Sequence, residues 1–370
     1  MAGPDTVDLD LHGFAMVRII DGGEADLAAV RRQLGPLPKA TGREPDLVVR
    51  FVDRIPFDGR LRYLGAHDIG FTDAGFYVLR SRKRPVVVAL PMADLGGPCE
   101  IRCERGVPAV PYLIATLNLA VLGKGVLPLH AAAFELDGVG TLVTGWSKGG
   151  KTELLMAAAG AGARYVGDEW VYLTEAGTMH GIPEPIRLWD WHLDQLPEIR
   201  ARLSRGERTR LRGIRALRGL DAATPDGVRR RVPPNRLLHR AMPVLEGQLH
   251  VDVPPERLFG KVGDMSARID RVLLVMSAAG EETTVEPVGG EEVARRMSAS
   301  LLYERLDVRA LYLQARYARP ELHNPLLESL EERQRELLLA RLGGRAAHLV
   351  THPYPVDLHA LLDAVRPVIA

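Results

Sequence analysis

The sequence is poor in cysteine, has almost no net charge and contains no long apolar run. Its two cysteines, Cys99 and Cys103, are too few for a disulfide-stabilised scaffold and lack the second ligand pair of a structural zinc site. The 48 basic and 47 acidic residues leave a net charge of +1, which does not favour nucleic-acid binding by the whole chain. No run of about 18 apolar residues occurs, and the first residues carry no apolar segment of signal-peptide length. We therefore expect a cytoplasmic protein with no membrane partner.

The composition and length are those of a globular protein of two or three domains. Of the 370 residues, 46% are hydrophobic and 26% are charged. From residue 14 to about 123, short apolar runs alternate with turns and helical patterns, which predicts a small α/β domain over residues 1–123. Cys99 and Cys103 would lie on one face of a strand there, on either side of Ile101. Residues 124–370 are expected to form the catalytic domain.

The second half of the chain carries a regular series of strand and helix patterns. AAAFEL and GTLVTG, joined by an Asp-Gly turn, predict a hairpin that leads through a glycine-rich loop into the helix TELLMAAA. RYVGDEWVYL predicts a single following strand. Further on, QLHVDVPP and RIDRVLLVMS predict strands, residues 291–305 and 325–342 predict helices, and the last residues predict a strand and a final helix.

Residues 145–152, GWSKGGKT, match the phosphate-binding loop pattern G-x-x-x-x-G-K-[ST] at every fixed position. The preceding strand and following helix provide the context that this motif requires, because backbone N–H groups and the helix N-terminus converge on phosphate oxygens. Lys151 would neutralise the phosphates, and the Thr152 hydroxyl would bind Mg²⁺. The expected nucleotide-binding residues are Gly145, Trp146, Ser147, Lys148, Gly149, Gly150, Lys151, Thr152 and Glu153. The alternatives are a glycine-rich turn for the loop, a packing role for Trp146 and a solvated side chain for Lys148.

Two adjacent acids, Asp168 and Glu169, follow an apolar strand start. One could act as general base toward a hydroxyl and the other could help to hold a metal, or both could simply belong to a turn. His130 lies fifteen residues before the loop, between two apolar residues. It is a candidate site residue, and the alternative is a half-buried, hydrogen-bonded histidine without a catalytic role.

An arginine-rich insertion is expected at about residues 195–245. Between residues 200 and 240 there are thirteen arginines and three acids, so that the local charge is 13 − 3 = +10. The segment has no aromatic residue between Leu193 and Met242, which does not support base stacking. Three interpretations stay open: an exposed helical insertion without a specific partner, a lid or docking surface for an acidic or phosphorylated substrate, and a nucleic-acid contact.

The run LHAAAFELDGVGTLVTGWSKGGKTELLMAAAGAGARYVGDEWVYL, followed by GIPEPIRL, resembles the catalytic domain of the HPr kinase/phosphorylase family, and more closely the HPr-kinase-related, serine-kinase-like proteins. The resemblance covers about residues 125–190. It implies a P-loop kinase domain of the phosphoenolpyruvate carboxykinase-like type with a mixed sheet, together with the smaller N-terminal α/β domain. Two features differ: the arginine-glycine-x-glycine signature after the acidic pair is missing, and Glu184 stands where relatives commonly have a basic residue.

The resemblance also implies roles for the site residues. Asp168 would deprotonate the acceptor hydroxyl, Glu169 would bind Mg²⁺ together with Thr152, and His130 and Lys151 would lie near the transferred phosphate. The expected function is a Mg²⁺-dependent kinase that transfers the γ-phosphoryl group of ATP to a serine or threonine hydroxyl of a peptide, protein or free amino acid. The alternatives are an NTP hydrolase or switch, and a non-catalytic nucleotide-gated docking protein. The acceptor, the phosphoryl donor and the formation of a homo-oligomer stay open.

Overall fold

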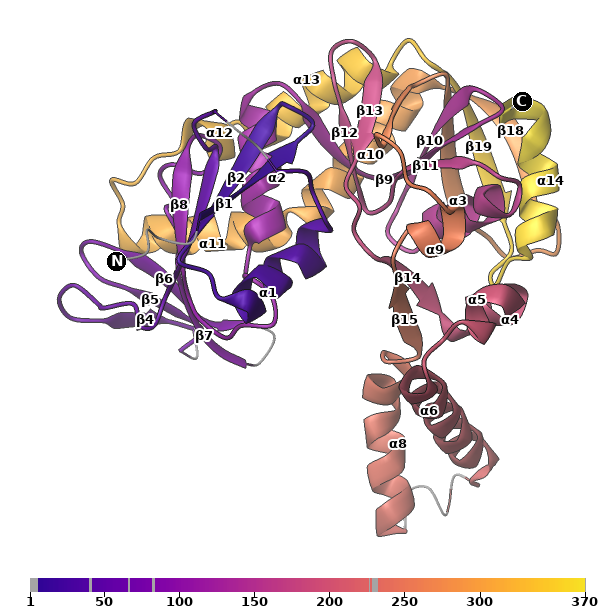
Figure 1. Ribbon diagram of the computed structural model, residues 1–370, viewed down its shortest axis with the longest axis horizontal. Coiled ribbons are helices and arrows are strands. Elements are labelled where there is room, and N and C mark those ends of the chain that lie inside the picture. Colours follow the sequence, from indigo (N-terminus) through magenta and orange to yellow (C-terminus); the bar gives the residue numbers. More distant parts are fainter. Residues whose placement is uncertain are drawn as a thin grey trace. The chain divides into compact units, whose positions relative to one another are not determined.

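The computed structural model describes residues 6–39, 42–65, 67–81, 84–225, 227 and 232–369. The chain forms two compact units, one of Met1–Glu184 with Val262–Ala370 and the other of Pro185–Lys261. Large mixed sheets combined with helices confirm the predicted α/β class (Figure 1). The division at residues 123 and 124, and the kinase type of the fold, stay predictions. No described helix is long and apolar enough to cross a membrane.

The first sheet of the larger unit has eight strands, of which β2, β3 and β8 run parallel to one another. Two helices accompany it, α1 (Glu24–Leu34) and α2 (Leu113–Gly123). In spatial order the strands are β1 (Thr6–Leu11), β2 (Ala15–Ile20), β3 (Leu47–Val52), β8 (Cys99–Glu104), β7 (Arg84–Ala89), β6 (Phe76–Ser81), β5 (Ile69–Phe71) and β4 (Arg62–Leu64).

Strand β8 places Cys99, Ile101 and Cys103 on one face, as the alternation of the sequence predicts. Ile101 and Cys103 are fully buried and Cys99 is partly buried against the same core. Both cysteines are free thiols, and burial raises the pKa of each to about 12. These residues therefore stabilise the sheet by packing rather than by redox or metal chemistry.

The second sheet of this unit has nine strands and carries the phosphate-loop motif. Strands β10, β17 and β19 are parallel neighbours, so their carboxyl ends meet at one edge of the sheet. In spatial order the strands are β16 (Ser266–Arg268), β13 (Thr178–Gly181), β12 (Trp170–Leu173), β9 (Leu127–Leu136), β10 (Val139–Gly145), β17 (Arg271–Ser277), β19 (Ala346–His352) and β18 (Thr284–Gly289), and β11 (Arg164–Gly167) also pairs with β9.

Two pairs of helices pack on the second sheet. Helix α3 (Lys151–Gly160) packs with α14 (Leu358–Ile369), and α10 (Gly290–Glu304) packs with α13 (Leu330–Leu342). Helix α11 (Leu306–Ala318) and the short α12 (Pro325–Glu328) lie between α10 and α13 in the chain. The helix predicted over residues 325–342 is thus divided at Ser329. Buried Asn324 donates to the carbonyl oxygens of Met92, Ala93 and Leu95 and accepts from the Leu327 amide, which begins a separate helical turn at this point.

The single strand predicted over residues 164–173 is also wrong, because the chain forms β11 and β12 with Asp168 and Glu169 between them. Both strands pair with β9, and the register shifts within β11, between Tyr165 and Gly167, so that the bulge lies at Val166. Glu169 has a left-handed φ of 60°, and its carbonyl still accepts from the Ala131 amide at 3.1 Å. The Trp170 amide donates to the Asp168 carbonyl at 2.7 Å, so the two acids form a tight turn between β11 and β12, just after the bulge. Bulges often re-aim side chains beside active sites.

The smaller unit contains a two-stranded ribbon and a helical hairpin. The ribbon pairs β14 (Ile186–Trp189) with β15 (His250–Val253), and α6 (Arg205–Ala223) and α8 (Pro233–Glu246) lie side by side (Figure 1). The described residues of this unit also form three short helices, α4 (Asp190–Gln195), α5 (Pro197–Ala201) and α9 (Glu256–Phe259). Most of the predicted arginine-rich insertion is thus helical, while Arg229, Arg230 and Arg231 lie outside the described residues.

Candidate functional site

The predicted phosphate loop connects β10 to α3 at the carboxyl edge of the parallel strands. Two of its glycines are required by the backbone. Gly145 has a φ of 152°, and a Cβ there would lie 2.3 Å from the Val275 carbonyl oxygen. Gly150 has a φ of 109°, and a Cβ there would lie 2.0 Å from Nε2 of His352. The motif glycines therefore allow a close approach of the loop to β17 and to the end of β19.

Lys151 begins α3 and is buried, with 6% of its surface exposed. Its Nζ donates to the carbonyl oxygens of Gly145 at 3.2 Å and Trp146 at 2.9 Å. Burial lowers the pKa of this amine, while the charges of Glu169 and Asp168 act in the opposite direction. The amino group is therefore held inside the curve of the loop, where a phosphate oxygen could replace a carbonyl as its partner.

Asp168 faces the loop and is almost inaccessible to solvent, with 2% of its surface exposed. The hydroxyl of Thr152 lies 3.3 Å from each carboxylate oxygen. Burial, followed by the negative charge of Glu169, raises the pKa of Asp168 to about 7. A carboxyl group with this pKa can accept and release a proton near neutral pH, which is the property required of a general base.

His130 lies between two carboxylates. Its Nε2 is 3.1 Å from Glu169 and its Nδ1 is 2.7 Å from Glu304, so the protonated ring can donate to both. Burial disfavours the imidazolium, but the hydrogen bonds to Glu169 and Glu304 outweigh it and raise the pKa of His130. The hydrogen bond from His130 correspondingly lowers the pKa of Glu304. The ring also stacks on Trp170. The structure thus places His130 within hydrogen-bonding distance of Glu169, and its catalytic role stays a prediction.

Three further side chains surround the site, and of these the sequence singles out only Glu184, as a difference from the relatives it resembles. Glu304 comes from the end of α10 and His352 from the end of β19, where Nε2 of His352 lies 3.0 Å from the Gly149 carbonyl oxygen. Glu184 has an Oε1 atom that is buried without a hydrogen-bond partner in the described part of the chain. Burial, followed by the charges of Glu169 and Asp168, raises the pKa of Glu184 well above its ordinary value. These surroundings favour the neutral form of the Glu184 carboxyl group.

The remaining loop residues border solvent. Trp146 and Tyr303 are exposed at 50% and 53%, and their rings lie 5.0 Å apart between centroids. Lys148 is also exposed, with a left-handed φ of 61°, while Ser147 is half-buried. Glu153 occupies the first turn of α3. An exposed aromatic pair at the predicted phosphate loop offers a stacking surface for a planar group.

The chemistry of the donor set suits Mg²⁺ bound together with phosphates. Thr152, Asp168 and Glu169 supply oxygen atoms, which Mg²⁺ prefers. No group of three or more His, Cys, Asp or Glu side chains among the described residues is placed to hold a metal ion by itself. Comparison of the chain with protein-family models finds no match, and comparison with curated proteins finds none either. The geometry of these side chains is therefore the basis for inferring the function of the chain.

Proposed function

We propose that the chain is a Mg²⁺-dependent kinase that transfers the γ-phosphoryl group of ATP to a serine or threonine hydroxyl of a peptide, protein or free amino acid. The observation that carries the proposal is the buried Asp168, whose pKa is raised to about 7 and which lies 3.3 Å from the hydroxyl of the phosphate-loop Thr152. Transfer of a phosphoryl group to a hydroxyl is assisted by a base that lies next to the bound phosphates and accepts the hydroxyl proton. The resemblance to HPr-kinase-like proteins supports the same activity.

The loop would bind the nucleotide through residues 145–153. Backbone N–H groups at the start of α3 would face the phosphates, and Lys151 would exchange its carbonyl partners for phosphate oxygens. Thr152 and Glu169 are the proposed Mg²⁺ ligands, and the ion would neutralise charge on the phosphates. The Trp146 and Tyr303 rings would cover the planar base or an aromatic group of the acceptor.

Asp168 would take the proton of the acceptor hydroxyl as its oxygen attacks the γ-phosphorus. The bond from the γ-phosphorus to the bridging oxygen breaks, and the nucleoside diphosphate leaves with that electron pair. Because burial holds the pKa of Asp168 near neutrality, the carboxylate is basic enough to accept the proton and is still ionised in a large fraction of molecules at pH 7. The proton can then return to solvent.

His130 would supply positive charge beside the reacting phosphoryl group. The carboxylates of Glu169 and Glu304 favour its imidazolium form, and hold the ring by hydrogen bonds from both nitrogens. A fixed positive charge in a partly buried site stabilises the charge that develops on the transferred group. The arginine-rich insertion would dock a peptide or protein acceptor in this proposal.

One observation favours a second candidate, an NTP hydrolase or switch. The Thr152 hydroxyl contacts Asp168, an arrangement that would also let Asp168 act at the metal. Glu169, whose side chain is about half exposed, would then orient water instead of an acceptor hydroxyl.

Two measurements on one preparation separate these functions. Candidate acceptors incubated with ATP and Mg²⁺ are analysed by mass spectrometry for a phosphoryl group, and free phosphate is measured without any acceptor. If the chain is a kinase, the acceptor is phosphorylated by the wild type and not by Lys151→Ala. Rapid acceptor-independent phosphate release with no phosphorylated product would favour the hydrolase. Nucleotide binding without either reaction would favour the non-catalytic docking protein.

A further inference from the structure

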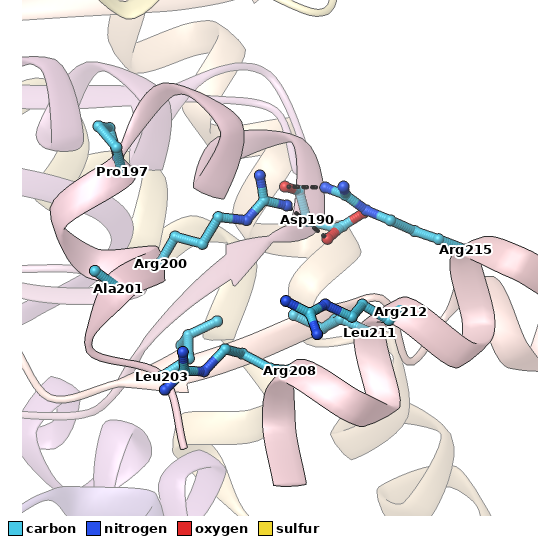
Figure 2. Close-up of a pocket in the computed structure, with 9 residues that line it drawn as sticks. All are labelled: Asp190, Pro197, Arg200, Ala201, Leu203, Arg208, Leu211, Arg212 and Arg215. Carbon is cyan, nitrogen blue, oxygen red and sulfur yellow. Dashed lines mark hydrogen bonds and ion pairs between the residues drawn. The ribbon is translucent and has the colours of Figure 1, made fainter. Parts of the chain in front are cut away.

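The smaller unit contains a cavity of about 440 Å³ whose polar lining is dominated by arginine. Figure 2 shows Arg200 reaching into it from α5, and Arg208, Arg212 and Arg215 reaching into it from α6. The volume is within the range of small-ligand pockets, roughly 300 to 1,000 Å³. The lining residues are Asp190, Pro197, Arg200, Ala201, Leu203, Arg208, Leu211, Arg212 and Arg215.

Two of the four arginines already have acidic partners. Arg215 pairs with Asp190, and its second terminal nitrogen lies 3.0 Å from Asp194. Arg200 pairs with Asp194 and lies 3.8 Å from Asp190. Asp190 is 6% exposed, so this cluster fixes the wall of the cavity rather than leaving its charges available.

The other two arginines have no such partner. Neither Arg208 nor Arg212 makes a hydrogen bond or ion pair to any residue in the described part of the chain, apart from the backbone bonds of the helix. They lie one turn apart on α6, and like charges at this spacing destabilise a helix by about 0.2 to 0.5 kcal/mol. Beside them, Leu203 and Leu211 are buried and form an apolar floor. The arrangement keeps two guanidinium groups directed toward one cavity at a local energetic cost.

The formal charge of the side chains at the cavity indicates which kind of anion would bind there. The four lining arginines less Asp190 and its neighbour Asp194 leave 4 − 2 = +2 at the cavity. A carboxylate would neutralise half of this charge, whereas a phosphoryl group carries about −1.5 to −2 at neutral pH. The planar guanidinium also matches tetrahedral oxyanions through paired N–H donors.

We propose that this cavity, the arginine pocket, binds the phosphoryl group of a phosphate ester, carried either by a small molecule or by a phosphorylated side chain of a peptide. Arg208 and Arg212 contact the phosphoryl oxygens. Arg200 and Arg215 add positive charge nearby, and their ion pairs with aspartates hold their side chains in position. The pocket residues all belong to Pro185–Lys261, whereas the phosphate loop belongs to the larger unit. The inference is therefore independent of phosphoryl transfer by the loop.

A neighbouring cavity in the same unit has a different lining charge and contains an arginine that can serve as a control. It encloses about 480 Å³ and shares Asp190 and Arg215 with the arginine pocket. Its other ionisable lining residues are Asp194, Arg218 and Glu246, so the lining charge is 2 − 3 = −1. Arg218 lies on the same helix as Arg208 and Arg212 and is also exposed, which makes it the matched control.

The test uses the full chain carrying Lys151→Ala, so that binding at the phosphate loop does not contribute. Calorimetric titrations are made with inorganic phosphate, with a phosphoserine blocked at both termini, and with a serine peptide in phosphorylated and unphosphorylated form. Arg208→Gln with Arg212→Gln is compared with Arg218→Gln. Glutamine retains helix propensity, and thermal unfolding verifies that each variant folds.

We expect phosphoryl ligands to bind to the chain. The double variant should lower their affinity by at least about tenfold, because two charge-assisted contacts are lost. Arg218→Gln should change the affinity less than about twofold. Inorganic phosphate binding as tightly as the phosphopeptide indicates a small ester as the ligand, and much tighter binding of the phosphopeptide indicates a peptide. The proposal is overturned if no phosphoryl ligand binds at millimolar concentration, if the unphosphorylated peptide binds equally well, or if Arg218→Gln weakens binding as much as the double variant. None of these results depends on catalysis.

Discussion

Replacing Asp168 by asparagine should make the protein more stable and less active at the same time. The pKa of Asp168 is raised from 3.8 to about 7, first by burial and then by the charge of Glu169. The pKa of Asp168 in the folded protein is thus about three units above its value in the unfolded chain. At about 1.4 kcal/mol per pKa unit, this difference corresponds to a free energy of about 4 kcal/mol. Ionising this carboxyl group therefore costs up to about that free energy in the folded protein.

The direction of the pH dependence follows from proton binding. Between pH 3.8 and about 7 the folded protein retains a proton on Asp168 that the unfolded chain has released. The free energy of unfolding therefore decreases as the pH rises through this window, and the contribution of the neutral carboxyl group is fully present only below it. Asparagine is neutral at every pH, and its Oδ1 can still accept from Thr152. The free energy of unfolding of Asp168→Asn should thus equal that of the wild type below pH 4 and exceed it above pH 7.

The assay is thermal unfolding of both proteins across this pH range, together with acceptor phosphorylation at pH 7.5. We expect Asp168→Asn to raise Tm by roughly 5 °C at pH 8, and to have little effect at the acidic end. Phosphoryl transfer should fall by roughly 100-fold or more with nearly unchanged nucleotide affinity, because an amide cannot accept the hydroxyl proton. Glu169→Gln, at the more exposed acid, is the control and should instead raise the Mg²⁺ concentration that activity requires. A lower Tm for Asp168→Asn at pH 8, or an equal Tm difference at all pH values, would refute the reasoning.

Three further changes test the loop and its surroundings. Lys151→Ala should remove nucleotide-dependent activity at a cost of about 2 to 4 kcal/mol in transition-state stabilisation, and wild-type turnover would contradict the assignment. Glu304→Gln should lower the pKa of His130, since it removes a hydrogen-bonded carboxylate; an unchanged imidazole titration by NMR would show that this contact is unimportant. Gly150→Ala should destabilise the protein by at least about 1 to 3 kcal/mol in denaturant titration, because its Cβ would collide with His352, and native stability would argue against this loop conformation.

Local patterns in the sequence predict most of the elements around the site. The alternation of AAAFEL and GTLVTG, the Asp-Gly turn at residues 137 and 138 and the following alanine-rich helix correspond to β9, β10 and α3. Positive φ angles at both turn residues are those of the hairpin turn that Asp-Gly favours. These features are predictable because strand periodicity, turn residues and helix starts depend on neighbours only a few positions apart.

The phosphate-loop motif, the adjacent acids and the α/β class can be predicted from residue types at short spacing. The contacts that complete the site join residues far apart in the sequence. Glu304 reaches His130 across 174 positions of sequence, and His352 reaches Gly149 across 203. The contact between His352 and Gly149 exists because β19 runs parallel to β17, and β17 to β10, so that their carboxyl ends meet at one edge of the sheet. The contact between Glu304 and His130 joins the end of α10 to β9. The position of Asp168 beside Thr152 likewise depends on the pairing of both β11 and β12 with β9. Strand pairing is set by the burial of whole sheet faces, which no local pattern records.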